Sequence, residues 1–259
     1  MPRFAANLSM MFNEVDFLDR FEAAAKAGFK GVEYLFPYAF DASELKKKLD
    51  DNGLTQVLHN LPAGDWDAGE RGIACLPGRV DEFKEGVDKA IEYATTLGCK
   101  QVNCLAGIMP DSIDYDHARE IFVSNLGFAA DKLKTAGIKL LIEPINTRDI
   151  PNFLLHGTEQ ALTIINDTGS DNLFVQYDIY HMQIMEGDLA PTIEACIKMI
   201  PHMQLADNPG RHEPGTGEIN YPFLFDFIDG LGYDGWIGCE YKPATTTEEG
   251  LGWYAPYKS

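Results

Sequence analysis

The chain has few features of a membrane protein, a secreted protein or a protein stabilised by a structural zinc site. Its 259 residues include five cysteines with no CxxC spacing. An odd number of irregularly spaced cysteines argues against a zinc knuckle and a disulfide framework. No apolar run approaches the roughly 18 residues that a membrane span needs, and the N-terminus lacks the apolar centre of a signal peptide. We therefore expect a cytoplasmic protein with free thiols.

Positive charge is also scarce. The chain has 21 Lys and Arg residues against 40 Asp and Glu residues, which gives a formal net charge of −19. A field of this sign repels nucleic acids and anionic membranes, so we expect neither as a partner. An anionic substrate would need local basic side chains to reverse the potential at its site.

A glycine-rich phosphate-binding motif is absent, because NLSMMF follows the first expected strand where a dinucleotide-binding fold would have GxGxxG. Instead, an amphipathic segment repeatedly ends at a glycine and a short apolar segment follows. Glycine just past a helix end adopts the left-handed conformation without steric cost. The glycines in question are Gly28, Gly53, Gly98, Gly137, Gly169 and Gly232.

The repeat predicts eight parallel strands that alternate with helices. The strands are apolar on nearly every residue, as is typical of strands covered on both faces. Eight such units favour a (β/α)8 TIM barrel in a single domain over residues 1–259, with a doubly wound open sheet as the alternative. The expected strands are 3–8, 31–35, 54–59, 100–105, 138–143, 173–178, 202–206 and 235–240, and the expected helices are 14–27, 42–52, 79–97, 116–136, 158–168, 183–199 and 221–230.

Every expected strand has a polar or ionisable residue at its end or within two residues of it, where a TIM barrel keeps its active-site groups. In the first four strands these residues are Asn7, Glu33, His59 and Asn103, each of which could equally be a rim residue or a cap. In the last four they are Glu143, Asp178, Gln204 and Glu240. Three acids on neighbouring strands would repel one another without a cation. All-oxygen ligands favour Mg²⁺ or Mn²⁺.

Two glutamates beside a divalent cation suit proton transfer next to a carbonyl group. The cation would polarise a ketone or aldehyde oxygen and stabilise the enediolate that forms. One glutamate would remove a proton from carbon, and the other would return it to the neighbouring or opposite position. Glu143 and Glu240 are the natural candidates, because the fifth and eighth strands would place them on opposite sides of the metal.

At these two glutamates the sequence resembles the hydroxypyruvate isomerase family of the xylose-isomerase-like TIM barrel superfamily. The resemblance is carried by RFAANLSMMF, VEYLFPY, LHNLPAGDWDAGERGIACLPGR, LLIEPIN, QYDIYHMQ, HEPGTGEINYP and GWIGCEYKP. It implies reversible isomerisation of hydroxypyruvate to 2-hydroxy-3-oxopropanoate, in glyoxylate metabolism. It also implies that Glu143 and Glu240 exchange the proton and that Glu143, Asp178, Gln204 and Glu240 bind the metal.

Other activities stay open within the superfamily. The ketose 3-epimerases usually have a histidine where this chain has Gln204, and a 2-oxo-tetronate branch shares RFAANLSMMF and EYKP. The segment HNLPAGDWDAGERG favours the hydroxypyruvate branch. An abasic-site endonuclease is opposed by the negative charge, and a binding protein without catalysis is opposed by the intact Glu143 and Glu240.

The substrate carboxylate requires a cation in this acidic chain. Arg71, Arg211 and Lys242 are the candidates, and we favour Arg71, although each could be a solvated surface residue. His181, three residues after Asp178, could contact substrate oxygens, and His59 could face the same pocket. The loop 207–220 contains several Gly and Pro residues and could close over the substrate. A homo-oligomer is compatible with the sequence.

Overall fold

Eight parallel strands follow one another in chain order, separated by helices, so the predicted (β/α)8 TIM barrel is confirmed. The computed structural model describes residues 1–258. The strands are β1 Arg3–Asn7, β2 Gly31–Glu33, β3 Thr55–Asn60, β4 Gln101–Cys104, β5 Lys139–Ile142, β6 Leu173–Asp178, β7 His202–Leu205 and β8 Trp236–Cys239.

Nine α-helices and four short 3-10 helices are found in the described residues. The α-helices are α1 Arg20–Ala27, α2 Ala42–Asn52, α3 Val80–Leu97, α4 Tyr115–Thr135, α5 Thr158–Thr168, α6 Ile179–Met185, α7 Leu189–Cys196, α8 Tyr221–Gly230 and α9 Thr247–Gly250. The 3-10 helices are Phe17–Asp19, Pro77–Arg79, Ile197–Met199 and Leu251–Tyr257. The bounds of α2, α5 and α8 are those predicted from the sequence.

The single helix expected over 183–199 is wrong. Asp178 ends β6, and its side chain accepts a hydrogen bond from the backbone N–H of His181, so α6 starts immediately after the strand. Gly187 and Asp188 have positive φ values of 64° and 46°, which right-handed helix cannot contain. The segment is therefore two helices with a break between them.

The chain divides into two groups of residues, each with its own four-strand sheet. The first group contains residues 1–57 and everything described from Tyr177 onward, and its strands pair in the order β2–β1–β8–β7. The second group contains residues 58–176, and its strands pair in the order β3–β4–β5–β6. The expectation of a single domain over 1–259 stays a prediction.

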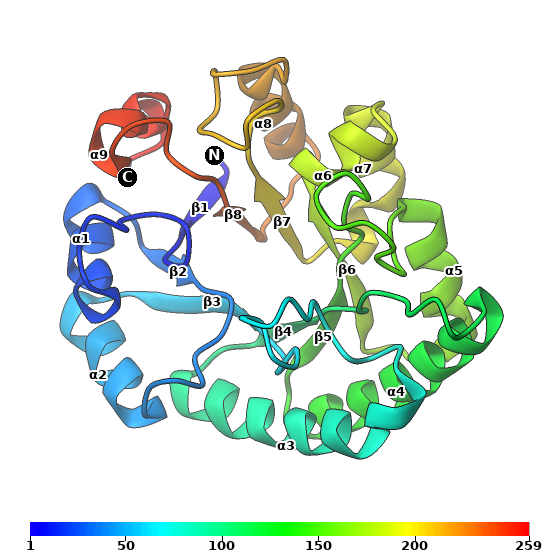
Figure 1. Ribbon diagram of the computed structural model, residues 1–259. Helices are drawn as coiled ribbons and strands as arrows, with labels where there is room; N and C mark the ends of the chain where they lie inside the picture. The colour runs from blue at the N-terminus through cyan, green and yellow to red at the C-terminus, as the bar shows by residue number, and fades with distance from the viewer. Residues whose placement is uncertain (259) are drawn as a thin grey trace. The chain divides into compact units, whose positions relative to one another are not determined.

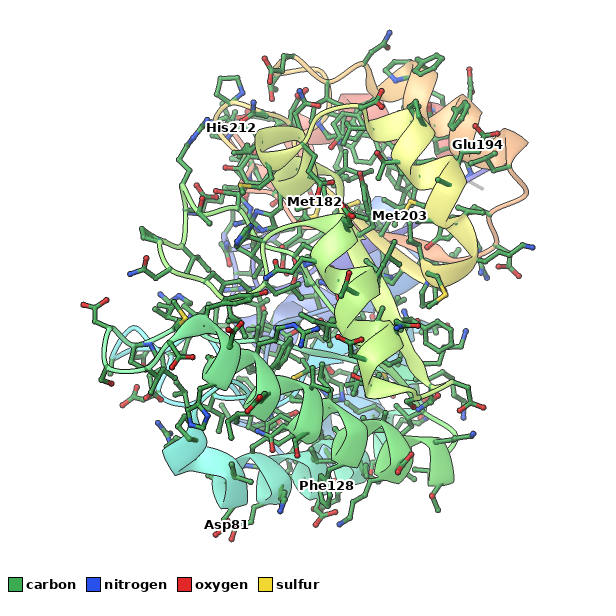
Figure 2. All side chains as sticks on the ribbon, turned by 90° about the vertical axis from the view of Figure 1, so that its right-hand side faces the viewer. Asp81, Phe128, Met182, Glu194, Met203 and His212 are labelled. Carbon is green, nitrogen blue, oxygen red and sulfur yellow. The ribbon has the colours of Figure 1, made fainter. Side chains whose placement is uncertain are left out.

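In the second group, α3 and α4 lie side by side and cover one face of β4 and β5 (Figure 1). Their outer surface is charged and partly aromatic, and Figure 2 shows Asp81 and Phe128 pointing outward from it. The ammonium groups of Lys84 and Lys132 lie 5.4 and 5.3 Å from the Phe128 ring centre. The opposite faces of both helices are buried, as the helical spacing of their apolar residues predicts.

In the first group, the C-terminal segment completes an aromatic cluster around Phe4 of β1. Four rings meet the Phe4 ring with centroid distances of 5.0 to 5.9 Å. They are Phe225 of α8 and Trp253, Tyr254 and Tyr257 of the last 3-10 helix. Edge-to-face aromatic pairs of this kind stabilise a core beyond the area that they bury. The cluster fixes the end of the chain against β1.

We predict that Phe4→Ala lowers the free energy of unfolding by about 3–5 kcal/mol, because it empties a buried aromatic site. Phe223→Ala is the control, since Phe223 is 55% exposed, and its cost should stay within about 0.5 kcal/mol. Urea denaturation followed by tryptophan fluorescence measures both variants. Equal and small losses for the two variants would contradict the role given to the cluster.

Candidate active site

In the second group, Glu143 follows β5 and accepts a hydrogen bond from Asn103, which also donates to Asn60. Asn103 on β4 donates from Nδ2 to Glu143 Oε2 and to Asn60 Oδ1, both at 3.1 Å. The carboxyl ends of parallel strands share one edge of a sheet, which places these three residues together. Glu143 is only 5% exposed, so its charge is removed from bulk water and depends on such donors.

His59 lies at the end of the neighbouring strand β3 and is fully buried. Burial lowers the pKa of its imidazole to about 4, against the weaker opposing effect of the Asn60 carbonyl 3.1 Å from Nδ1. The ring is therefore neutral at pH 7. If His59 contacts a substrate, it does so as a hydrogen-bonding group and does not supply positive charge.

Arg71 lies in the loop after β3 and is held by its own segment. Its Nη1 atom donates to the carbonyl oxygens of Trp66 and Glu70 at 3.0 and 2.7 Å. Its guanidinium carbon stands 4.1 Å from the centre of the Trp66 ring, a cation–π stack. The contacts fix the orientation of this half-buried cation, and its proposed contact with a substrate carboxylate stays a prediction.

In the first group, Asp178, His181 and Glu240 converge. One potential ligand atom from each lies within 4.8 Å of the others, and all three side chains are buried. Asp178 ends β6, His181 lies in the first turn of α6, and Glu240 follows β8. The sequence predicted two of these three as metal ligands and placed His181 with the substrate. Two carboxylates and an imidazole at this separation fit a divalent cation.

Glu240 has neighbours of both signs. Asn7 Nδ2 donates to its Oε1 at 3.3 Å, and Arg211 Nη2 donates to its Oε2 at 2.7 Å. Burial raises the pKa of Glu240 to about 8, Arg211 opposes this shift, and the carboxylates of Asp178 and Glu33 add to it. A cation bound among these acids would lower that pKa, so the electrostatics of the site favour a metal ion.

Gln204, the other predicted ligand in the first group, donates from Nε2 to Glu33 Oε1 at 2.8 Å. Glu33 also accepts from Asn7 at 3.0 Å, and its Oε2 lies 2.7 Å from Nε2 of His202. All four side chains are buried. From the sequence, Asn7 and Glu33 were predicted only as polar strand ends without an assigned role. His202 was not predicted, although it precedes Gln204 by two residues and so lies on the same strand face.

The loop 207–220 is organised by the buried side chain of Asp207, which the sequence did not single out. Its Oδ1 accepts from the backbone N–H groups of Asn208 and Ile219, and its Oδ2 accepts from those of Gly215 and Gly217, at 2.9 to 3.1 Å. A side chain at position 217 would meet the Asn208 carbonyl, which explains the glycine there. The loop is an ordered turn in this structure.

This loop carries Arg211, one of the three predicted carboxylate-binding cations. Arg211 has a φ of 57°, and its guanidinium carbon stands 5.1 Å from the Tyr180 ring centre while Nη2 reaches Glu240. The backbone N–H of Lys242 donates to the Arg211 carbonyl at 2.8 Å, although the Lys242 side chain is exposed. Of the two predicted carboxylate-binding residues in the first group, Arg211 and Lys242, Arg211 is the one that contacts the candidate site.

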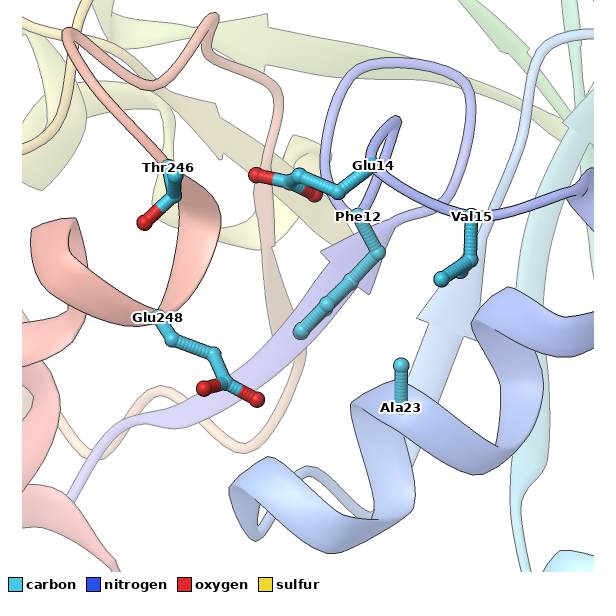
Figure 3. Close-up of a pocket in the computed structure, with 6 residues that line it drawn as sticks. All are labelled: Phe12, Glu14, Val15, Ala23, Thr246 and Glu248. Atoms are coloured by element: carbon cyan, nitrogen blue, oxygen red, sulfur yellow. The ribbon is translucent and has the colours of Figure 1, made fainter.

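A surface pocket of about 260 Å³ lies beside α1 and α9 (Figure 3). Glu14 at its edge accepts hydrogen bonds from the backbone N–H and hydroxyl of Thr247, at 2.6 and 3.2 Å, and so holds the loop after β1 against α9. The residues that line the pocket include no basic side chain, so it does not suit an anionic acid.

Among residues 1–258, no helix has both the length and the apolar character needed to cross a membrane.

Comparison with known proteins gives consistent results. Residues 21–257 match the family model described as the xylose isomerase-like TIM barrel. The chain is 58% identical over 258 residues to hydroxypyruvate isomerase of Escherichia coli (strain K12), with 100% of both chains covered. It is 52% identical to 2-oxo-tetronate isomerase of Cupriavidus necator, with 99% of both chains covered.

Among solved structures, a Brucella melitensis protein named AP endonuclease, family 2, is similar over 100% of both chains, with a TM-score of 0.98 and 49% identity. A structure named L-ribulose 3-epimerase has a TM-score of 0.75 and 25% identity, covering 99% of this chain and 86% of its own. The same architecture therefore accompanies several names, and the identities of side chains have to decide between activities.

We predict that Asp207→Asn releases the loop 207–220. One carboxylate oxygen becomes an NH₂ group, so two backbone donors lose their acceptor and face another donor. Losing buried hydrogen bonds worth about 1–3 kcal/mol should speed hydrogen exchange at Gly215 and Gly217 by roughly 5- to 150-fold. Exposed Asp234→Asn is the control. Unchanged exchange in Asp207→Asn would contradict the anchoring role.

Proposed function

Given that the chain belongs to the xylose isomerase-like TIM barrel family, we propose that it is a metal-dependent isomerase that interconverts hydroxypyruvate and 2-hydroxy-3-oxopropanoate. The convergence of buried Asp178, His181 and Glu240 is the observation that carries the proposal. The enzyme class rests on relatives of full length that are named isomerases.

We assign the metal ligands to Glu143, Asp178, Gln204 and Glu240, with Mg²⁺ or Mn²⁺ as the cation. In TIM barrels the carboxyl ends of the strands form one catalytic face, which supports grouping Glu143 with the other three. Gln204 contributes through its amide oxygen, since its nitrogen is engaged by Glu33. A divalent cation bound by these residues would polarise the substrate oxygens and stabilise enediolate charge.

Glu143 and Glu240 carry the proton in this proposal. One of them removes a proton from C3 of hydroxypyruvate, which leaves an enediolate across C2 and C3. The other carboxyl group gives a proton to C2, and the proton of the C3 hydroxyl passes to the C2 oxygen, so that C3 becomes the aldehyde and C2 carries the hydroxyl. The product has the same atoms and charge as the substrate. Asn103 orients Glu143, and Arg211 with Asn7 orients Glu240.

The remaining polar residues are assigned to substrate binding. Arg211, and not Arg71 as favoured from the sequence, is the leading proposed partner for the substrate carboxylate, because its guanidinium already reaches Glu240. Arg71, Lys242, His59 and His181 are further proposed contacts, of which neutral His59 contributes only hydrogen bonds. Five free cysteines support the proposed cytoplasmic location. A role in glyoxylate metabolism follows from the proposed substrate. Sedimentation of the purified protein would test whether it forms a homo-oligomer.

A 2-oxo-tetronate isomerase, or a ketose 3-epimerase, is the second candidate activity. The relative named 2-oxo-tetronate isomerase is 52% identical, only slightly less similar than the relative named hydroxypyruvate isomerase. Gln204 in place of a histidine argues against the epimerase. DNA cleavage, which the name of the Brucella melitensis structure suggests for that protein, is disfavoured here because a net charge of −19 opposes contact with the phosphate backbone.

We predict that the Mn²⁺- or Mg²⁺-loaded protein converts hydroxypyruvate faster than 2-oxo-tetronate or a free ketohexose. ¹H NMR of each incubation would follow the loss of substrate and the gain of aldehyde hydrate signals. Prior treatment with EDTA should abolish turnover, and added metal should restore it. Turnover of only the four-carbon acid or only the ketohexose would show that hydroxypyruvate is not the substrate. Full activity after EDTA treatment would contradict the proposed metal dependence.

We predict that Glu143→Gln and Glu240→Gln each lower kcat by about 10²- to 10⁴-fold, the usual contribution of a general acid or base. Glutamine keeps the size of the side chain and an oxygen for the cation, so the fold should persist by circular dichroism. Exposed Glu248→Gln is the control and should keep wild-type kcat. Wild-type kcat in either site variant would overturn the acid–base assignment for that residue.

A further inference from the structure

A buried carboxylate lies beneath the candidate site and takes no part in the proposed proton transfer. Glu33 at the end of β2 is 1% exposed. Its Oε1 accepts from Asn7 Nδ2 at 3.0 Å and from Gln204 Nε2 at 2.8 Å, and its Oε2 lies 2.7 Å from His202 Nε2. A charge in this position is costly, and an apolar side chain would fill a barrel interior at lower cost. Its presence therefore calls for a function.

The chain leaves space for this carboxylate. Gly238 on β8 pairs in register with Gln204 on β7, and a Cβ atom at position 238 would lie 2.3 Å from both carboxylate oxygens of Glu33. The Glu33 side chain thus extends over a strand position that has no side chain of its own and reaches β7. His202 and Gln204 are two residues apart on β7, so they share the face that Glu33 meets.

The hydrogen bond to Gln204 determines which end of its amide faces the carboxylate. An ionised carboxylate only accepts hydrogen bonds, so the NH₂ group of Gln204 has to face Glu33. The amide oxygen, on the other branch of the same group, is then directed away from Glu33. Metal cations of the hard type bind oxygen and not an amide nitrogen. Glu33 therefore selects the end of Gln204 that a cation can use.

The same carboxylate also orients a donor to Glu240. Asn7 accepts a hydrogen bond from the backbone N–H of Ser9 at its Oδ1, which turns its NH₂ group toward the acids. That NH₂ group lies 3.0 Å from Glu33 Oε1 and 3.3 Å from Glu240 Oε1. Glu33 consequently touches, through one oxygen, both the ligand amide and the asparagine that donates to a proposed acid–base residue.

We propose that Glu33 is a positioning residue for the metal site: it fixes the amide of Gln204 with its oxygen presented to the cation and holds Asn7 as the donor to Glu240. The inference rests on the proposed function only in taking Gln204 as a ligand. Within the described residues, Glu33 lies outside the group formed by Asp178, His181 and Glu240, so it acts through other side chains.

Mn²⁺ affinity tests the proposal without substrate. Electron paramagnetic resonance of free Mn²⁺ during titration of the purified, chelator-treated protein gives the dissociation constant. In Glu33→Gln, the new amide can donate to the Gln204 oxygen, so that the Gln204 amide turns and its NH₂ group faces the cation. Mn²⁺ should then bind about 10- to 100-fold more weakly, the usual effect of losing a residue that orients a ligand. Glu44→Gln on the exposed face of α2 removes the same charge and should bind Mn²⁺ as the wild type does.

The double variant Glu33→Gln with Gln204→Glu supplies a rescue that a purely structural role would not give. The new glutamine donates to the new glutamate, whose second oxygen faces the cation, and the net charge equals that of the wild type. Mn²⁺ affinity should recover most of the loss. Glu33→Asp is the second variant: it keeps the charge but withdraws the acceptor from Gln204, so it should weaken Mn²⁺ binding even if Glu33→Gln does not fold.

Wild-type Mn²⁺ affinity in both Glu33→Gln and Glu33→Asp would overturn the proposal, as would a wild type that binds no Mn²⁺. Equal weakening in Glu33→Gln and in the double variant would also overturn it, because the amide direction would then not matter. The outcome is independent of the substrate. Loss of Mn²⁺ binding in the Glu33 variants, combined with no turnover of hydroxypyruvate by the wild type, would retain the inference and reject the proposed activity.

Discussion

Burial of carboxylates is the constraint on which the rest of this structure depends. Each buried acid described above is matched by donors from neighbouring strands or loops: Glu143 by Asn103, Asp178 by a helix N–H, Asp207 by four backbone N–H groups, and Glu33 by two amides. Amides and backbone N–H groups reduce the cost of burial without cancelling the charge. The asparagine residues at strand ends are thus explained by the acids beside them.

The compensation around Glu240 is incomplete, and the proposed function is placed at this residue. Arg211 and Asn7 donate to it, yet its pKa is still raised to about 8 by burial, with Asp178 and Glu33 contributing. A divalent cation bound here would stabilise the ionised form of these acids. Asp207, which accepts from four backbone N–H groups, and Glu33, whose Oε1 accepts from two amides, serve instead as fixed points that hold a loop and an amide in place.

The sequence predicted the fold well because glycines and apolar runs act locally. Gly53 and Gly169 adopt left-handed conformations at the ends of α2 and α5, and both helices have the predicted bounds. The helix 183–199 was wrong because its break depends on Asp188 at positive φ, which an apolar pattern does not reveal. The last 3-10 helix, Leu251–Tyr257, was missed because aromatic contacts with Phe4 stabilise it, not an amphipathic repeat.

The candidate site was predictable only in part. Strand ends pointed to Asp178 and Glu240, which the structure brings together, and the assignment of Gln204 as a ligand stays a prediction. The contact between Glu33 and His202 depends on space left by Gly238, which is a three-dimensional property. Period-two spacing from Gln204 was the one available signal for His202. The position of His181 beside Asp178 follows from a helix start directly after β6, which the sequence placed four residues later.

The most direct measurement is a crystal structure of the protein soaked in Mn²⁺, with anomalous difference density to locate the ion. The account predicts a single strong peak bonded to carboxylate oxygens of Glu143, Asp178 and Glu240 and to the amide oxygen of Gln204, with Glu33 outside the coordination shell. A peak coordinated by His181 in place of Gln204, or no peak among these residues, would contradict it.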